Sequence, residues 1–222
     1  KDKIDVTFLR VNKTMNWSSA FKGVTAPLLI DNIDTDQIIP SRKMKTVSKI
    51  GLNKSLFANW RYNYIKGKKA GSNHDFILNK KEFLNSSILL SGKNFGCGSS
   101  REHAVWALKD FGIKIVIAES FGRIFKNNCV RNQLLTIELT RIQIELINEL
   151  IKKDVKNNII EIHLEKKLIV VPNHKNFEFD IDPFLMEMLL KGQDFIEYSL
   201  GKEKIIDKFI KNDKNKRSWA YL

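Results

Sequence analysis

Cysteine is scarce in this chain of 222 residues, which carries only Cys97 and Cys129. Two cysteines cannot form the framework of bridges that holds small secreted domains together. They also cannot hold a four-iron cluster, because its iron atoms take more cysteine thiolates than this chain has. No metal site is therefore expected in the chain itself, and any cluster that the protein uses is expected on another chain.

Long apolar runs are absent as well. No stretch approaches the length of a membrane span, and residues 1–10 lack the apolar core of a signal peptide. The sequence therefore predicts a cytoplasmic protein without membrane contact. Residues 1–22 have the character of a loose N-terminal arm, and residues 23–222 are expected to form a single domain with a C-terminal helical extension.

Positive charge is in excess, with 38 Lys and Arg against 25 Asp and Glu, a net charge of +13. This excess fits either an anionic partner such as nucleic acid or a solvated, lysine-rich surface. Lysine outnumbers arginine, the usual residue for bidentate recognition of phosphates and bases. The lysines are also spread along the chain, and no RNA-binding aromatic motif or zinc spacing occurs. A solvated surface is favoured, and a basic nucleic-acid-binding module stays as the alternative from another class.

The middle of the chain has the most regular pattern. A short apolar strand over residues 87–90 precedes a glycine loop over 92–98, a helix over 101–111 and a second strand over 113–118. This order predicts a βαβ unit with parallel strands, and hence an α/β fold. Residues 65–73 read as a loop. Further expected elements are strands over 24–30, 134–139, 159–164, 168–171 and 177–179, and helices over 55–64, 121–128, 141–152, 183–191 and 205–211.

The loop over residues 96–101 combines backbone freedom with a positive side chain. Gly96 and Gly98 let the backbone approach a ligand closely, and the helix expected to begin at Arg101 presents free N–H groups. The guanidinium of Arg101 adds a bidentate clamp for a carboxylate. The patterns of dinucleotide-binding loops, phosphate-binding loops and serine-hydrolase elbows do not fit this segment. The loop therefore predicts a site for a small carboxylate or phosphate.

The candidate side chains also have structural explanations. Ser99 stands three residues before a glutamate, the spacing of a capping box, and spacing alone favours a capping role. His103 is expected to pack against its surroundings, and Cys97 to fill space between two glycines rather than to react. The turn that contains Asp34 and Asp36 has enough carboxylates for a hard cation, but such residues are more typical of caps and turns.

Two motifs resemble a known family. Residues 96–104, GCGSSREHA, resemble the signature of the mobile C-terminal domain of the aconitase superfamily. Residues 34–40, DTDQIIP, resemble the companion motif of the small subunits of isopropylmalate isomerases. Four shorter segments resemble those subunits in the same order, at residues 56–62, 75–79, 120–125 and 132–135. The resemblance therefore extends over most of the chain.

The resemblance implies a stand-alone swivelling domain of three β/β/α layers and a larger partner subunit that carries a [4Fe–4S] cluster. It also implies a hydro-lyase, active only with that partner, which interconverts 2-isopropylmalate and 3-isopropylmalate in leucine biosynthesis by dehydration and rehydration. Ser99 would remove the carbon-bound proton of this hydroxy-diacid, and Ser100 and Arg101 would hold a carboxylate. The iron on the partner would act as a Lewis acid on the leaving hydroxyl.

The turn after Pro40 matches the loop with which members of this family sort substrates. Lys43, Met44 and Lys45 are the residues expected to face the substrate there. Met44 suits contact with an isopropyl group. Relatives commonly have an aromatic residue where Lys43 stands, so the same chemistry on another acid, such as methylmalate/citraconate or homoaconitate, stays open.

Overall fold

The computed structural model describes residues 17, 20–44, 48–99, 101–172, 174 and 176–221. Most of the expected N-terminal arm lies outside these residues, as do the candidate site residues Ser100 and Lys45. Within the described part, Trp17 is buried and its ring lies 5.5 Å from that of Phe21. Strand β1 begins at Phe21, so the sheet starts two residues before the boundary expected for the arm.

Seven strands form one mixed sheet in the order β6-β5-β4-β1-β7-β8-β9. β1, β4, β5 and β6 are parallel neighbours, and β7, β8 and β9 continue from β1 in antiparallel pairs. The central strands are runs of Ile, Leu and Val with nearly every side chain buried, as expected for parallel strands covered on both faces. Their bounds are β1 Phe21–Leu28, β4 Ser86–Ser91, β5 Ile115–Ala118, β6 Leu135–Glu138, β7 Ile159–His163, β8 Leu168–Val170 and β9 Phe177–Glu178.

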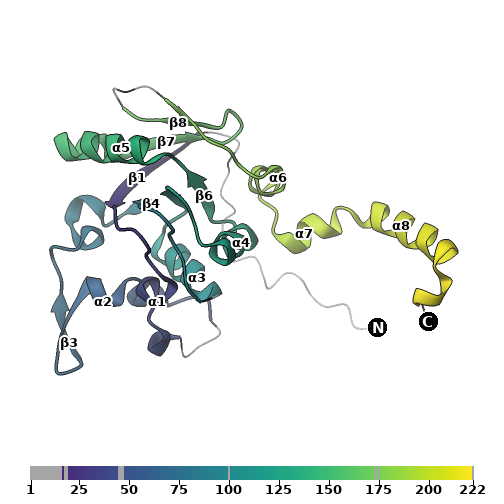
Figure 1. Ribbon diagram of the computed structural model, residues 1–222, viewed down its shortest axis with the longest axis horizontal. Helices are drawn as coiled ribbons and strands as arrows, with labels where there is room; N and C mark the ends of the chain where they lie inside the picture. The colour runs from purple at the N-terminus through teal and green to yellow at the C-terminus, as the bar shows by residue number, and fades with distance from the viewer. Residues whose placement is uncertain are drawn as a thin grey trace.

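Helices cover the parallel strands from both sides. In Figure 1, α3 and α4 lie below the central strands and α5 lies above them. Helix α3 ends at Gly112, whose φ of 113° is the left-handed conformation typical of a helix C-cap. The longer helices are α3 Glu102–Phe111, α4 Arg123–Arg131, α5 Arg141–Lys153, α6 Pro183–Lys191, α7 Phe195–Leu200 and α8 Glu203–Lys216.

The C-terminal helices differ in part from the prediction. Helix α6 has the expected bounds, whereas α7 was not expected and α8 is longer at both ends than the predicted 205–211. Both α7 and α8 extend away from the sheet (Figure 1), and their apolar side chains are largely exposed. Without a buried stripe, their boundaries depend on caps such as Asp194, which is bonded to the N–H of Glu197.

A hairpin replaces the loop expected at residues 65–73. It joins β2 (Tyr62–Ile65) to β3 (Lys68–Ser72), after the short helix α2 (Ala58–Arg61). Lys66 and Gly67, with φ of 47° and 75°, form the two-residue turn, and left-handed residues there match the twist of the strands. The hairpin was missed because most of its side chains are exposed, so it lacks the alternation of apolar and polar residues that marks a half-buried strand.

The mixed α/β architecture expected from the sequence is confirmed, including the parallel pair β4 and β5 with α3 between them. In the described part of the chain, no helix is both long and apolar enough to cross a membrane.

Candidate active site

The site lies where the loops after the parallel strands meet. Ligands of α/β sheets commonly bind beyond the carboxyl ends of such strands. The loop after β4 is held to the loop after β1 by backbone hydrogen bonds from Gly96 N to Ile33 O (2.7 Å) and from Thr35 N to Cys97 O (3.0 Å). It is held to the loop after β5 by a bond from Phe95 N to Ser120 O (3.0 Å). Three segments distant in sequence therefore form one surface.

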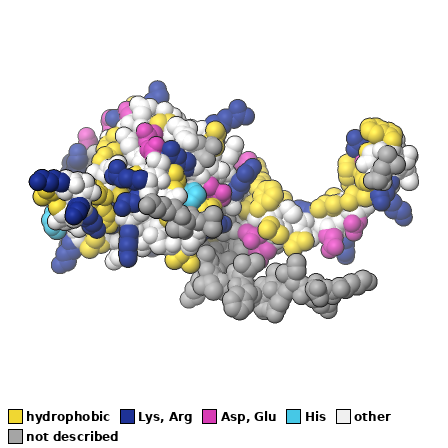
Figure 2. Space-filling model, turned by 90° about the horizontal axis from the view of Figure 1, so that it is seen from below, with side chains coloured by type: hydrophobic (Ala, Val, Ile, Leu, Met, Phe, Trp, Pro, Cys, Tyr) yellow, Lys and Arg dark blue, Asp and Glu magenta, His cyan; other side chains and the backbone are white. Residues whose placement is uncertain are grey.

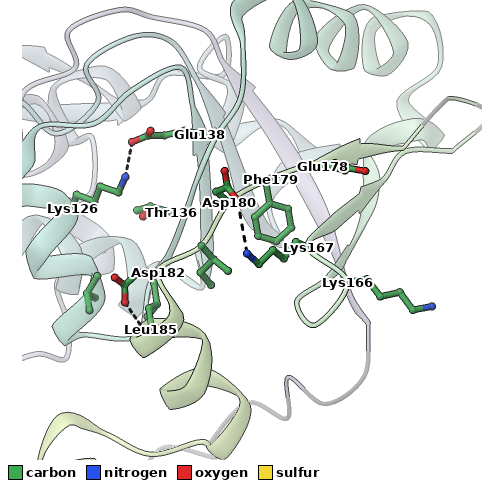
Figure 3. A pocket seen from close by; sticks show the side chains of 12 residues that line it. Lys126, Thr136, Glu138, Lys166, Lys167, Glu178, Phe179, Asp180, Asp182 and Leu185 are labelled. Atoms are coloured by element: carbon green, nitrogen blue, oxygen red, sulfur yellow. Dashed lines mark hydrogen bonds and ion pairs between the residues drawn. The ribbon is translucent and has the colours of Figure 1, made fainter.

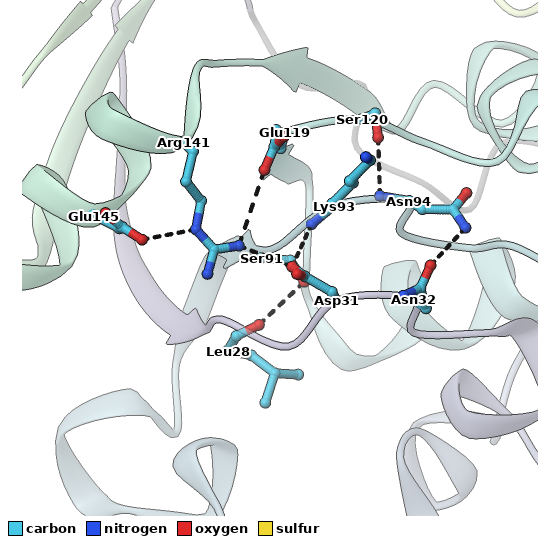
Figure 4. A network of polar contacts seen from close by, with 10 residues as sticks. All are labelled: Leu28, Asp31, Asn32, Ser91, Lys93, Asn94, Glu119, Ser120, Arg141 and Glu145. Carbon is cyan, nitrogen blue, oxygen red and sulfur yellow. Dashed lines mark hydrogen bonds and ion pairs between the residues drawn. The ribbon is translucent and has the colours of Figure 1, made fainter.

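Polar side chains reinforce this junction (Figure 4). Asp31 accepts a bond from the N–H of Lys93 (2.8 Å) and one from the guanidinium of Arg141 (2.9 Å). These contacts, the backbone N–H first, hold the pKa of Asp31 below its ordinary value. Asn94 bonds Asn32 across the same gap at 2.9 Å. The carboxylate of Asp31 is therefore a structural tie between the two loops.

Gly96 and Gly98 give the signature loop its shape. Both have left-handed φ values, 73° and 87°. A Cβ at Gly96 would lie 2.2 Å from Cγ of Phe125, which is far inside van der Waals contact. A Cβ at Gly98 would meet nothing closer than 3.5 Å. Gly96 is thus required by both conformation and space, whereas Gly98 is required by conformation alone.

Ser99 does not cap the helix, so the capping-box interpretation is wrong. Helix α3 begins at Glu102 with Arg101 in the N-cap position, and no side chain caps it. The carbonyl of Ser99 instead accepts bonds from Thr35 Oγ1 and from Arg101 N, both at 2.9 Å. Those bonds fold the chain into a turn before the helix, so that the N-cap is Arg101, two residues beyond Ser99. The side chain of Ser99 is exposed and its hydroxyl bonds no other described residue.

Arg101, two residues after this serine, is held in place by Asp36. The guanidinium of Arg101 forms an ion pair with the Asp36 carboxylate, which also accepts a bond from Ser41 N at 2.9 Å. The guanidinium holds the pKa of Asp36 below its ordinary value, with the Ser41 N–H as a further cause. Asp36 thus connects the arginine to the first residue of the turn after Pro40. Sequence reasoning had left its role open.

Asp34 has the capping role that the sequence favoured. It accepts a bond from Gln37 N (2.7 Å), and the Gln37 side chain accepts one from Asp34 N (2.8 Å), which completes a capping box for α1 (Thr35–Ile38). Within the described ranges, no group of three or more His, Cys, Asp or Glu is arranged to hold a metal ion. The acidic turn is therefore used for structure.

Asn132 was missed as a support of the loop. Its side-chain Nδ2 donates to Glu102 Oε1 (2.7 Å), and its side-chain Oδ1 accepts from Trp106 Nε1 (3.0 Å). The ring of Trp106 lies 4.6 Å from that of His103, consistent with the packing role expected for this histidine. In the sequence, Asn132 was noticed only as part of the resemblance. The contact with Glu102 spans thirty positions, so no local pattern predicts it.

Neither cysteine has the environment of a nucleophile. Burial, followed by the negative charge of Asp34, raises the pKa of the Cys97 thiol. Cys129 is completely buried, and burial raises the pKa of its thiol strongly. Thiolates are disfavoured at both positions, in agreement with the packing role expected for Cys97.

The turn after Pro40 is described in part. Lys43 ends a 3-10 turn (Ser41–Lys43) and is exposed, whereas Met44 is half-buried and packs against the core. Arg42 donates a bond to Asn59 at 2.6 Å, which holds the turn against α2.

A hollow of about 940 Å³ lies away from these loops, among α4, β6, the turn before β8, β9 and the start of α6 (Figure 3). It contains none of the predicted site residues. Its charges are partly paired, since Lys126 lies 2.7 Å from Glu138 and Lys167 lies 3.8 Å from Asp180. This hollow is therefore separate from the surface that carries the signature loop.

Comparison with known proteins assigns the chain to a family. Residues 15–142 match the model of the aconitase C-terminal domain. The 3-isopropylmalate dehydratase small subunit of Rhodopseudomonas palustris (strain BisB18) is 45% identical over 93% of this chain and 100% of its own. The subunit of the same name from Campylobacter jejuni subsp. doylei is 50% identical over 87% of this chain and 95% of its own.

A solved structure agrees. The crystal structure of 3-isopropylmalate dehydratase from Methanocaldococcus jannaschii is similar with a TM-score of 0.60 and 31% identity, over 86% of this chain and 98% of that one. The match extends over nearly the whole of each curated relative and of the solved chain. The chain therefore belongs to the aconitase C-terminal domain family, among the 3-isopropylmalate dehydratase small subunits.

Proposed function

We propose that this chain is the small subunit of a 3-isopropylmalate dehydratase, a hydro-lyase that interconverts 2-isopropylmalate and 3-isopropylmalate together with a large subunit. The near-complete overlap with small subunits of that name supports the assignment. Residues 23–222 act in this proposal as one swivelling domain with a helical extension.

Ser99 is the base in this proposal, and Arg101 binds a carboxylate of the substrate. The observation that carries this assignment is an exposed Ser99 hydroxyl, engaged by no other described residue, in a turn that is closed by the N–H of Arg101, whose guanidinium Asp36 holds in place. The positive charge of Arg101 favours the ionised hydroxyl, and no side chain caps the N–H groups at the start of α3. Ser100 assists in carboxylate binding.

The proton transfer follows from these positions. Ser99 Oγ takes the proton from the carbon next to the bound carboxylate, and in the reverse direction it returns the proton to that carbon. Arg101 holds the carboxylate so that this carbon faces the serine, which reduces the loss of orientational freedom in the reaction.

The [4Fe–4S] cluster implied by the family belongs on the large subunit in this proposal. Cys129 is completely buried and Cys97 lies alone in the loop, so the two cysteines do not form a ligand set. This chain thus supplies the proton-handling and carboxylate-binding groups, and the partner supplies the metal chemistry.

Reconstitution with a cluster-bearing large subunit tests the proposal. The small subunit alone should be inactive, and the pair should convert 2-isopropylmalate. A panel with methylmalate, citraconate and homoaconitate decides whether the exposed Lys43 has shifted the preference, since kcat/KM measures discrimination between substrates. Failure of the reconstituted pair to act on any of these acids would refute the proposed reaction.

A further inference from the structure

The positive charge of the chain is concentrated in one stretch. Residues 37–74 contain nine Lys and Arg and no Asp or Glu, so about a sixth of the chain contributes nine of the thirteen units of net positive charge. The cations are spread along the chain, as the sequence shows, but this stretch lacks the acids that balance them elsewhere. The stretch comprises the turn after Pro40, helix α2 and the hairpin β2–β3.

Seven of these cations are exposed on the described structure, and we call them the basic face: Arg42, Lys43, Lys49, Lys54, Lys66, Lys68 and Lys69. None forms an ion pair with an acid of the described residues, whereas Lys126, Arg141 and Lys191 elsewhere do. Figure 2 shows Lys and Arg side chains gathered at the end of the molecule opposite the projecting helices.

The neighbouring acids leave this charge uncompensated. Asp110 of α3 accepts a bond from Asn53 N at 2.7 Å, and Asp36 is paired with Arg101. Neither forms an ion pair with a cation of the basic face. A surface with one sign of charge attracts an acidic partner and repels a second copy of itself.

The basic face is continuous with the candidate active site. Arg42 is bonded to Asn59 of α2 and lies 5.9 Å from the ring of Tyr64 in the hairpin. Arg42, Lys43, Tyr64 and Gly67 line a hollow of about 600 Å³ between the turn and the hairpin. Lys49 lies 5.2 Å from the ring of Trp106, the residue that packs on His103.

Apolar side chains within the face distinguish it from an ordinary solvated surface. Ile50 and Ile65 are 79% and 68% exposed among the lysines. The hairpin is a two-stranded sheet of its own, and such a sheet is only marginally stable in water unless it packs against something. Exposed apolar residues within a charged rim are typical of a protein interface.

We propose that the basic face is the surface by which this chain docks onto an acidic surface of the cluster-bearing large subunit. The inference rests on the proposed function, because that function supplies the partner. Docking through this face brings Ser99 and Arg101, which adjoin it, to the boundary between the two chains. The cations also accelerate the encounter through long-range attraction, an effect that salt screens.

Charge reversal tests the proposal. The variant Lys54→Glu/Lys66→Glu/Lys68→Glu alters three exposed cations outside the proposed chemistry. Its matched control, Lys204→Glu/Lys208→Glu/Lys211→Glu, makes the same change in net charge on exposed residues of α8. Association with the cluster-loaded large subunit is measured at low and moderate salt, with thermal unfolding to verify the fold of each variant.

The face variant should bind the large subunit at least about tenfold more weakly at low salt, with a shallower dependence on salt than wild type. The affinity of the corresponding Lys→Gln variant should lie between those of wild type and the face variant. The control should bind as wild type does. At saturating large subunit, kcat and KM of the face variant should stay within about twofold of wild type.

Other outcomes overturn the inference in distinguishable ways. If the face variant binds the large subunit as tightly as wild type does, and the pair converts isopropylmalate, the docking surface is refuted and the proposed function stays intact. If the face variant has a raised KM but binds the large subunit as wild type does, the face serves the approach of the substrate instead. If wild type binds a DNA duplex, and the face variant loses this binding but keeps its association with the large subunit, the face is a nucleic-acid-binding surface instead. If the wild-type pair associates through the face but converts none of the acids, only the proposed function fails.

Discussion

Replacement of Ser99 by alanine separates a catalytic role from a structural one. The hydroxyl is exposed and bonds no other described residue, and the bonds that shape its turn involve only its backbone carbonyl. Ser99→Ala should therefore change the free energy of unfolding by no more than about 0.5 kcal/mol. A helix cap would instead contribute about 1 kcal/mol.

The effect on turnover should be much larger. Loss of a positioned general base typically slows a reaction by about 10² to 10⁴. This range corresponds to about 3 to 5 kcal/mol in the activation barrier. Arg101 and its partner Asp36 are unchanged in the variant, so KM should change far less than kcat.

Two measurements on the same protein test this reasoning. Conversion of isopropylmalate is measured with saturating large subunit, and thermal unfolding is measured on the isolated chain. Ser72→Ala, at an exposed position of β3, is the matched control and should alter neither. A fall in Tm of about 2 to 4 °C with turnover preserved would be the signature of a cap and would refute the assignment.

Two further substitutions address the supports of the loop. Asp36→Asn should raise KM about tenfold with a smaller effect on kcat, because the ion pair with Arg101 is removed. The guanidinium lowers the pKa of Asp36. The wild-type ion pair is therefore complete at pH values above the ordinary carboxyl pKa, and it is lost only as the pH falls through the lowered pKa of Asp36. The rise of KM toward acid pH should therefore be absent in Asp36→Asn, and a pH series of KM that shows it in both proteins would contradict this role. Gly96→Ala should destabilise by about 2 to 4 kcal/mol in denaturant unfolding, because its Cβ would overlap Phe125 at a left-handed φ. Gly67→Ala, with similar φ and open space, should cost only about 1 kcal/mol, and equal losses would show that the Phe125 contact is unimportant.

The elements with strong local signals were predicted well. Helix α6 has Asp182 as its N-cap, proline at its first position and Gly192 as its left-handed C-cap, and its predicted bounds were correct. The unit β4, α3 and β5 was predicted from apolar runs and from Gly112. These features are encoded within a few residues of one another, so a sequence pattern is sufficient to find them.

The details of the site depend on contacts that such a pattern does not contain. The bond from Thr35 to the carbonyl of Ser99 joins residues 64 positions apart, and it decides that α3 starts later than the capping pattern indicates. Asn132 and Glu102 are likewise distant in sequence. The motif therefore indicated the loop that is proposed as the active site, while tertiary contacts determine which of its side chains are engaged and which is exposed.

The backbone hydrogen bonds between the loops after β1, β4 and β5 have an evolutionary consequence. Main-chain groups survive most side-chain replacements, so the frame that positions Ser99 and Arg101 is insulated from substitutions in the neighbouring turn at residues 41–44. A lineage can therefore change the residue at position 43 without rebuilding the loop that carries Ser99 and Arg101. Lys43 in this chain is the kind of variation that such a division permits.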